Sequence, residues 1–288
     1  MKDTLTKAYA FNKHIRIYAA TTTNLVKTAQ AKHYLWPSSA AALGRTLTAS
    51  AIMAILKDED LTIKINGNGP IGDVFVDASK NGTVRGYVSE PELFFQYNQG
   101  PKKGHINVSN AVGTDGFLYV SRIINNEVFT STSPLQTGEI ADDFTYYFAA
   151  SEQIPSSVGL GVLVNTDNTI AAAGGFILQV MPDTPNEVLD LVEERIANLK
   201  DISQMVNEGY TPEDIIKEIS NDDYEILEDN IPLEFKCKCN RERFLNALRL
   251  IDQKELDELI KIGHAEAVCH FCNEKYTFDK DELISLKK

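Results

Sequence analysis

The sequence has four cysteines, all near its C-terminal end, and they form two close pairs. One residue separates Cys237 from Cys239, two separate Cys269 from Cys272, and 29 residues lie between the pairs. Thiolates are soft ligands that suit tetrahedral zinc, and each close pair can occupy two corners of the tetrahedron. The pattern therefore predicts that the four cysteines bind one Zn²⁺ ion.

Two histidines, His264 and His270, lie close to the second pair in sequence and could compete as ligands. Four thiolates, however, already complete a closed tetrahedral shell. We therefore expect both imidazoles to face solvent or to lie just outside the ligand shell.

The cysteine pattern leaves the use of the metal open. A structural zinc module is the commonest use of such a site. A zinc ribbon that binds nucleic acid is disfavoured, because no basic face with aromatic residues stands out near the cysteines. A disulfide reductase would place a single C-x-x-C at the start of a thioredoxin-like βαβ unit, which the sequence lacks. A redox switch also fits, since zinc-bound thiolates are oxidisable and each close pair can form a disulfide.

The elements that position the cysteines belong to a predicted C-terminal zinc-binding domain, residues 235–288. Asn240 can cap a short helix, and Asp252 opens a second helix that Gly263 ends. Two short strands, residues 265–269 and 275–278, are predicted on either side of the C-x-x-C turn. So small a domain has little apolar surface to bury, and zinc would supply about 10–16 kcal/mol toward its folding.

The segment before this domain carries the whole net charge of the chain. Residues 183–234 contain 16 acidic residues against three basic ones, a net −13, whereas the rest of the chain has 25 of each sign. Most runs of this kind are solvated helical faces. In a docked segment, such self-repulsion would also make release easy. We interpret residues 183–234 as an acidic helical linker.

Two helix starts are visible in this linker. Thr184 precedes Pro185 and Thr211 precedes Pro212, so each threonine is expected at an N-cap with proline in the first turn. The first helix is expected to end at Gly209 and to present one apolar stripe. This stripe comprises Val188, Val192, Ile196, Leu199, Ile202 and Val206. Such helices need a surface to cover, and we expect the preceding domain to supply it.

Residues 1–182 are predicted to form a mixed domain with a β-sheet and packed helices. Helices are expected near residues 25–34, capped by Thr22 or Thr23, and at 38–56 and 138–152. Strands are predicted from alternating apolar residues at 61–65, 73–77, 84–88, 117–124, 160–165 and 176–180. The fold class is thus α+β, with an acidic helical linker and a small zinc-binding domain after the first domain.

No motif in the first domain argues for an enzyme. Residues 67–72 match G-x-G-x-x-G, but a strand follows where a dinucleotide site needs a helix. We therefore expect a turn between two strands. Four carboxylates on or beside the third helix are expected to solvate it rather than to catalyse a reaction. They are Glu139, Asp142, Asp143 and Glu152.

Composition narrows the class of partner and the compartment. A net charge of −13 disfavours DNA, RNA and anionic membranes as main partners. The most apolar stretch, residues 158–181, contains polar residues and several glycines, so no membrane span is expected. The first residues lack the apolar core of a secretory signal. We therefore expect a cytoplasmic protein, in which clustered cysteines are metal ligands or redox sensors.

Motifs along nearly the whole chain resemble the heat-shock protein 33 family of redox-regulated chaperones. They are AALGRTLTA at 41–49, the turn at 67–70, VRGY at 84–87, GEIADD at 138–143, YF at 147–148, SEQ at 151–153, GGFILQ at 174–179, FKCKC at 235–239 and VCHFC at 268–272. The two cysteine pairs at this spacing are the most specific part of the resemblance. Asn240 stands where the family is expected to have serine or a similar cap, which is a minor departure.

The resemblance implies a chaperone that is dormant while reduced and zinc-bound. Oxidants, helped by unfolding conditions, would form the disulfides Cys237–Cys239 and Cys269–Cys272, release zinc, and unfold the C-terminal domain and the linker. The active form, usually a homodimer, would then hold unfolding client proteins without ATP. A constitutive structural zinc protein and a thiol-disulfide oxidoreductase stay open as competing classes.

Overall fold

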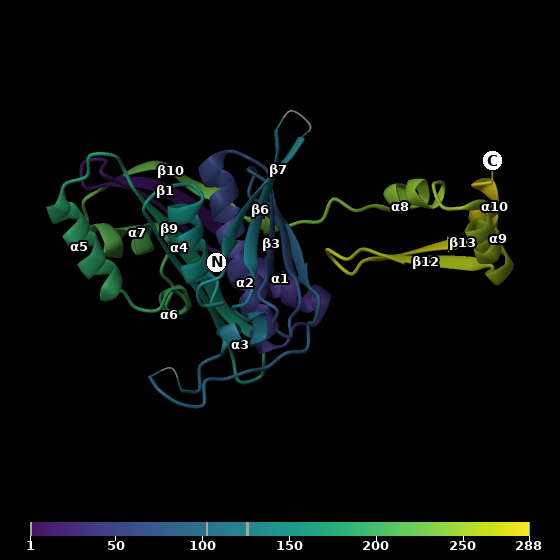
Figure 1. Ribbon diagram of the computed structural model, residues 1–288, viewed down its shortest axis with the longest axis horizontal. Coiled ribbons are helices and arrows are strands. Elements are labelled where there is room, and N and C mark those ends of the chain that lie inside the picture. The colour runs from purple at the N-terminus through teal and green to yellow at the C-terminus, as the bar shows by residue number, and fades with distance from the viewer. Residues whose placement is uncertain (1, 102, 125–126, 288) are drawn as a thin grey trace. The chain divides into compact units, whose positions relative to one another are not determined.

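The structure is a computed structural model that describes residues 2–101, 103–124 and 127–287. The chain divides into two compact units, Met1–Lys236 and Cys237–Lys288 (Figure 1). The larger unit holds two β-sheets with packed helices, which confirms the predicted α+β class. The acidic linker lies within the larger unit, and the separation of a domain at residue 182 stays a prediction.

The first sheet of the larger unit is antiparallel and has the strand order β10-β1-β2-β9-β8. Its strands are β1 (Thr4–Ala10), β2 (Ile15–Thr21), β8 (Ser156–Val164), β9 (Ile170–Val180) and β10 (Tyr224–Pro232). The sequence predicts parts of β8 and β9 but not β1 or β2. Alanines supply much of the buried side of these two strands, and alanine carries little strand propensity.

The second sheet has the strand order β11-β5-β4-β3-β6-β7. Its strands are β3 (Leu61–Asn66), β4 (Val74–Ala78), β5 (Thr83–Val88), β6 (Phe117–Ile124), β7 (Glu127–Pro134) and β11 (Glu234–Phe235). The predicted turn between β3 and β4 is confirmed. A Cβ atom on Gly67 would lie 2.3 Å from the carbonyl oxygen of Gly113. Close approach of two backbones, rather than a bound phosphate, explains this glycine.

The helices that precede the linker are α1 (Thr23–His33), α2 (Pro37–Lys57), α3 (Val108–Val112) and α4 (Ala141–Ala150). Thr22 is the N-cap residue of α1, but its hydroxyl lies 2.7 Å from that of Thr48 and makes no cap bond. The helix α2 packs against strands of both sheets. A Cβ atom on Gly44 would lie 2.8 Å from Val26 Cγ1, so a glycine is needed for this packing.

Within the described residues, α2 is also the one helix whose length and apolar composition would suffice to cross a membrane. Its apolar window is 89% buried inside the fold. Burial between the two sheets therefore accounts for its composition.

The carboxylates around α4 are mostly buried, which corrects the prediction that they solvate the helix. The Asp143 side chain is fully buried and accepts hydrogen bonds of 2.7 to 3.3 Å from backbone N–H groups of the turn before α4. Glu152 forms an ion pair with Lys57, and both side chains are 16% exposed. Asp142 is the exposed member of the set. The inward-facing N–H groups of the turn need an acceptor, and a carboxylate supplies it.

Glu139 lies in a half-buried polar cluster. It accepts hydrogen bonds from Arg45 Nη1 and from the Tyr97 hydroxyl, both at 2.6 Å, and from the backbone N–H of Ser109 at 3.1 Å. Burial opposes ionisation of Glu139, but the charge of Arg45 and these donors outweigh burial and lower its pKa. A carboxylate with a lowered pKa stabilises the fold above its unfolded pKa, about 4.3, and this contribution is lost as pH falls through the folded pKa.

Glu139→Gln is therefore expected to destabilise the larger unit at neutral pH by about 2 kcal/mol, because the half-buried Arg45 loses its carboxylate partner and keeps the backbone carbonyl of residue 139 as its acceptor. The difference from wild type should shrink at acidic pH, where the wild-type carboxyl also loses its charge. Urea unfolding followed by circular dichroism at both pH values measures this. Asp142→Asn, on the exposed side, should change stability little. An equal loss for Glu139→Gln at both pH values would contradict the argument.

The acidic linker packs its helices on the first sheet. They are α5 (Asn186–Ala197), α6 (Ile202–Asn207) and α7 (Pro212–Ser220), and they lie on one side of the larger unit beside β1 and β9 (Figure 1). The prediction of one helix up to Gly209 is wrong, since residues 198–201 separate α5 from α6. Thr184 is not the N-cap, because its hydroxyl donates to the carbonyl oxygens of His14 and Met181. The Thr211 cap is confirmed: its hydroxyl accepts from the backbone N–H of Asp214 at 3.2 Å.

The predicted docking of the linker through its apolar residues is confirmed. These residues share one buried cluster with the first sheet. The buried linker members are Val192, Ile202, Met205, Val206, Ile215, Ile216 and Ile219, and the sheet members include Ile15, Ile17, Phe176 and Leu178. The acidic side chains of the linker helices are mainly exposed around this cluster. The linker therefore covers one apolar face of the sheet.

The last part of the linker is a strand, which corrects the helical interpretation of residues 183–234. β10 pairs antiparallel with β1 at the edge of the first sheet. Its acids meet a lysine of β1 and a lysine of the turn after β1, with Lys7 Nζ 2.6 Å from Glu228 and Lys13 Nζ 3.6 Å from Glu225. The short strand β11 then pairs parallel with β5, and the Lys236 backbone N–H donates to the Val84 carbonyl at 2.8 Å. The chain is therefore held to the larger unit up to the residue before Cys237.

Candidate metal centre

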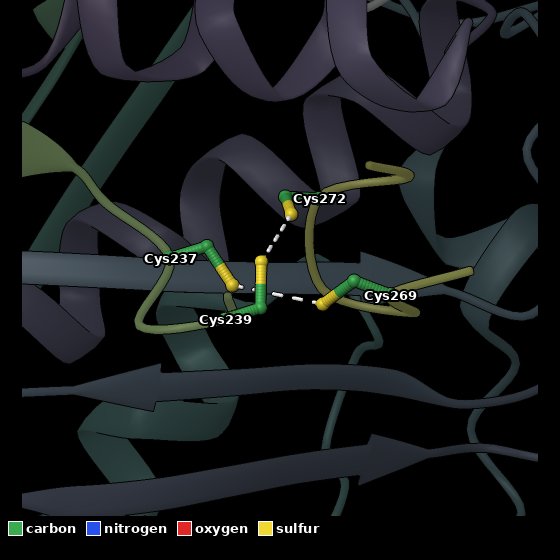
Figure 2. Close-up of side chains that lie close together, drawn as sticks. All are labelled: Cys237, Cys239, Cys269 and Cys272. Carbon is green, nitrogen blue, oxygen red and sulfur yellow. Dashed lines mark hydrogen bonds between the residues drawn. The ribbon is translucent and has the colours of Figure 1, made fainter. Parts of the chain in front are cut away.

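The four cysteine sulfur atoms converge in the smaller unit. They all lie within 4.8 Å of one another, as Figure 2 shows. Cys237 Sγ is 3.7 Å from Cys269 Sγ, and Cys239 Sγ is 3.3 Å from Cys272 Sγ. The edge of a tetrahedron of sulfur atoms around zinc is about 3.8 Å, given a zinc–sulfur distance of about 2.3 Å. The four thiols can therefore hold a metal ion of this kind.

A β-hairpin presents the second cysteine pair. Its strands are β12 (His264–Val268) and β13 (Lys275–Asp279), and the C-x-x-C turn lies at its tip. The Cys269 carbonyl accepts from the backbone N–H groups of Cys272 and Asn273, and Asn273 adopts a left-handed φ of 54°. This tight turn brings both sulfurs to the cluster, and the predicted C-x-x-C turn between two strands is confirmed.

The first cysteine pair comes from the extended segment before α8 (Arg241–Leu248). The predicted cap is confirmed, because Asn240 Oδ1 accepts from the backbone N–H of Arg243 at 2.9 Å. The unit also contains α9 (Gln253–Ile262), which ends at Gly263 with a φ of 92°, and α10 (Lys280–Ser285). The helices α8 and α9 connect the two cysteine pairs, and α10 follows the second pair.

The apolar core of the smaller unit is small. Its buried members are Leu256, Ala265, Phe278, Leu283 and Leu286. A core of this size contributes little against the chain entropy of about fifty residues. A bound metal ion would therefore supply much of the folding free energy of the unit.

Arg241 joins the start of α8 to the hairpin. Its guanidinium donates to both carboxylate oxygens of Glu282, at 2.6 and 2.7 Å, and to the Thr277 carbonyl at 2.7 Å. It also stacks 4.6 Å from the ring centroid of Phe278. This contact lies two residues after Cys239 and fixes the first cysteine pair against the second. No local pattern predicts this contact, because the partners are more than thirty-five residues apart.

Electrostatics favour a cation at the sulfur cluster. Cys269 and Cys272 are buried, and burial raises the pKa of both thiols above the ordinary value. Isolated thiolates are therefore unfavourable at these positions. A metal ion reverses the balance, because a coordinated thiol is deprotonated. The Tyr276 hydroxyl lies 3.2 Å from Cys239 Sγ, and this hydrogen bond raises the pKa of the phenol.

The two histidines do not belong to the cluster. His264 and His270 are both exposed, and the group of side chains placed to bind a metal contains sulfur atoms alone. A donor set of four sulfurs, with no carboxylate or imidazole, is typical of a closed structural zinc site.

Comparison with known proteins assigns the family. Residues 3–279 match the sequence model of the family described as Hsp33 protein. The chain belongs to the Hsp33 family. The resemblance that the sequence motifs indicate is thereby confirmed.

Similar members of this family cover the chain almost completely. A protein of Bacillus subtilis named 33 kDa chaperonin is 48% identical over 99% of this chain and 98% of its own length. The 33 kDa chaperonin of Staphylococcus carnosus is 47% identical over 99% and 97%. The crystal structure of the 33 kDa chaperonin of Thermotoga maritima, a heat shock protein 33 homolog, has a TM-score of 0.89 at 34% identity and covers 99% of this chain and 98% of its own.

Removal of the metal is expected to unfold the smaller unit and to leave the larger unit folded, because the small core of Leu256 and its neighbours is too weak alone. The reduced chain should be treated with a strong chelator and followed by far-UV circular dichroism and amide hydrogen exchange. Protection should vanish in residues 237–287 and persist in the two large sheets. Retention of protected amides around β12 and β13 after complete metal removal would contradict the expectation.

Proposed function

We propose that this Hsp33-family chain is a redox-regulated, ATP-independent holdase chaperone. It is dormant while reduced and zinc-bound, and it holds unfolding proteins after oxidation. The observation that carries the proposal is the sulfur cluster. In the sequence, its cysteines directly follow a linker that covers an apolar sheet face. Family membership supports the chaperone activity, and the clustered thiols support its control by oxidants.

The metal in this proposal is one Zn²⁺ ion, held by Cys237, Cys239, Cys269 and Cys272. The donor set of four sulfurs fits zinc in geometry and in softness. Bound zinc keeps the sulfurs deprotonated at neutral pH and stabilises the fold of the smaller unit.

Oxidation by a peroxide couples thiol chemistry to unfolding. A thiolate attacks one peroxide oxygen, giving a sulfenic acid and hydroxide, and a second thiolate displaces a second hydroxide as the sulfur–sulfur bond forms. Formation of each disulfide thus transfers two electrons from the two thiolates to one peroxide molecule. A sulfur–sulfur bond is about 2.05 Å long, whereas even neighbouring sulfurs of the cluster lie farther apart, at 3.7 Å for Cys237 and Cys269 and 3.3 Å for Cys239 and Cys272. Disulfide formation therefore breaks up the cluster, and by family resemblance the pairs are Cys237–Cys239 and Cys269–Cys272.

Loss of the metal would then destabilise the linker. β11 holds the chain to the larger unit through only two paired residues next to Cys237. The linker that leads into β11 carries a net charge of −13, and its ion pairs to Lys7 and Lys13 neutralise part of that charge. Released helices would expose their own apolar residues and the sheet face beneath them. Such a patch binds unfolded proteins.

The partners in this proposal are unfolded or partly unfolded client proteins, with a homodimer as the active form. Nucleic acids and anionic membranes are disfavoured by the net charge of −13. The proposed location is the cytoplasm, where reductants keep the thiols reduced until oxidative stress.

Treatment of the zinc-loaded protein with peroxide and mild heat is expected to release zinc, to lower the far-UV signal, and to suppress aggregation of a thermally unfolded client without ATP. Reductant and zinc should reverse all three changes. Zinc release without suppression of aggregation would support a constitutive structural zinc protein instead. Catalytic turnover of a disulfide substrate would support a thiol-disulfide oxidoreductase.

Removal of linker charge is expected to raise the temperature or oxidant dose needed for activation, because self-repulsion then favours release less. The variant is Asp190→Asn, Glu193→Gln and Glu194→Gln, three exposed acids of α5. A control with the same charge change outside the linker is Glu92→Gln, Asp115→Asn and Glu127→Gln, three exposed acids of the larger unit. Client aggregation measured over a range of temperatures gives the threshold. Equal thresholds for both variants would show that linker charge is not the cause.

A further inference from the structure

One side chain outside the ligand set makes direct contact with a ligand sulfur. The Tyr276 hydroxyl oxygen lies 3.2 Å from Cys239 Sγ. Tyr276 is in β13, opposite Ala267 of β12, so the hairpin fixes its backbone. Its ring packs on Phe244 of α8, with ring centroids 4.9 Å apart and an interplanar angle of 30°. The position of Tyr276 in β13 directs the hydroxyl toward the sulfur, and Phe244 packs against the face of its ring.

The direction of this hydrogen bond follows from ordinary chemistry. A phenol has a pKa of about 10, so it carries its proton at neutral pH. A metal-bound thiolate has no proton to donate and acts as an acceptor. The tyrosine hydroxyl is therefore the donor and Cys239 Sγ the acceptor.

The other cysteine pair receives hydrogen bonds of a different kind. Cys269 and Cys272 accept from backbone N–H groups, those of Phe271 and Glu274, within or just after the C-x-x-C turn. These donors come with the turn itself and no substitution of a side chain removes them. Cys239 precedes α8 and lies outside this turn. The hydrogen-bond partner of its sulfur is a side chain, Tyr276 of β13.

We propose that Tyr276 is a positioning residue of the metal centre that holds Cys239 in the ligand geometry and slows its oxidation. The inference rests on the proposed zinc site. Hydrogen-bond partners of metal ligands orient them, and loss of one typically weakens metal binding about 10–100-fold. The same bond stabilises the sulfur lone pair that must attack an oxidant, so it lowers the nucleophilicity of the thiolate.

In the oxidation step, the Cys239 thiolate and one peroxide molecule give a sulfenic acid and one hydroxide ion. The hydrogen bond from Tyr276 draws electron density from the sulfur that forms the new sulfur–oxygen bond. The oxygen–oxygen bond breaks, and its electron pair leaves with the hydroxide. The hydrogen bond stabilises the thiolate before the attack, so it slows the oxidation of Cys239.

Tyr276→Phe tests this on the full-length reduced protein, since it removes the hydroxyl and keeps the ring. Phe244→Leu is the matched control, because it removes the ring contact and keeps the hydroxyl. Zinc affinity is measured by competition with a chromophoric chelator, and zinc release is timed under a fixed excess of peroxide. Cobalt(II) loading gives a third readout, since its sulfur-to-metal charge-transfer bands respond to hydrogen bonds on the thiolate.

Tyr276→Phe is expected to bind zinc about tenfold more weakly, to release it several-fold faster under peroxide, and to shift the cobalt charge-transfer bands to lower energy. Phe244→Leu should leave the bands in place. Wild-type values in all three measurements would overturn the inference, as would equal losses in both variants without a band shift, which indicate packing alone. Failure of the wild-type chain to bind zinc would instead overturn the proposed function.

Discussion

The meeting of four sulfur atoms within 4.8 Å is the constraint on which the smaller unit depends. Burial raises the pKa of Cys269 and Cys272, so bare thiolates are unfavourable there. The apolar core of the unit is too small to hold the sulfurs together unaided. A cation solves both problems at once, because it stabilises the thiolates and ties two distant segments together. The same dependence makes the unit sensitive, since a reaction at the sulfurs removes the free energy that folds everything around them.

The linker depends on a second balance, between apolar burial and charge. Its helices bury isoleucine and valine side chains in the cluster shared with the first sheet. The linker carries a net charge of −13 over residues 183–234, and lysine partners such as Lys7 and Lys13 neutralise only part of its acids. Burial of apolar area contributes roughly 25 cal/mol per Å², whereas charge repulsion opposes it at every pH at which the acids are ionised. Opposed terms of this kind leave a small net free energy of docking for the linker. Unfolding of the neighbouring smaller unit can then shift the equilibrium between the docked and the released linker.

The sequence predicts those parts of the fold and site that local patterns encode. The grouping of the four cysteines follows from their spacing, the turn between two short strands from C-x-x-C, and the caps at Asn240 and Thr211 from residue type. Long-range partners have no local pattern. β10 pairs with a strand 221 residues away, as Lys7 and Glu228 show, and its acidic composition disguises a strand. The buried Asp143 appears polar and helical in sequence, and only the turn that folds over it shows why it must be inside. Tyr276 and Cys239 likewise meet although they are 37 residues apart in sequence.

Release of the linker would also remove the strand β10 from the first sheet, in addition to exposing an apolar face. The strand β10 occupies the edge of the first sheet, beside β1. When β10 leaves, β1 becomes the edge strand, with unpaired N–H and C=O groups along its length. The apolar residues that α7 covers on β1 and β2 become accessible in the same event. An unfolded chain offers both apolar side chains and an extended backbone, so an edge strand beside an apolar face matches both features. A folded protein satisfies its backbone internally and offers neither, which explains in physical terms how such a surface would select clients that are losing their structure.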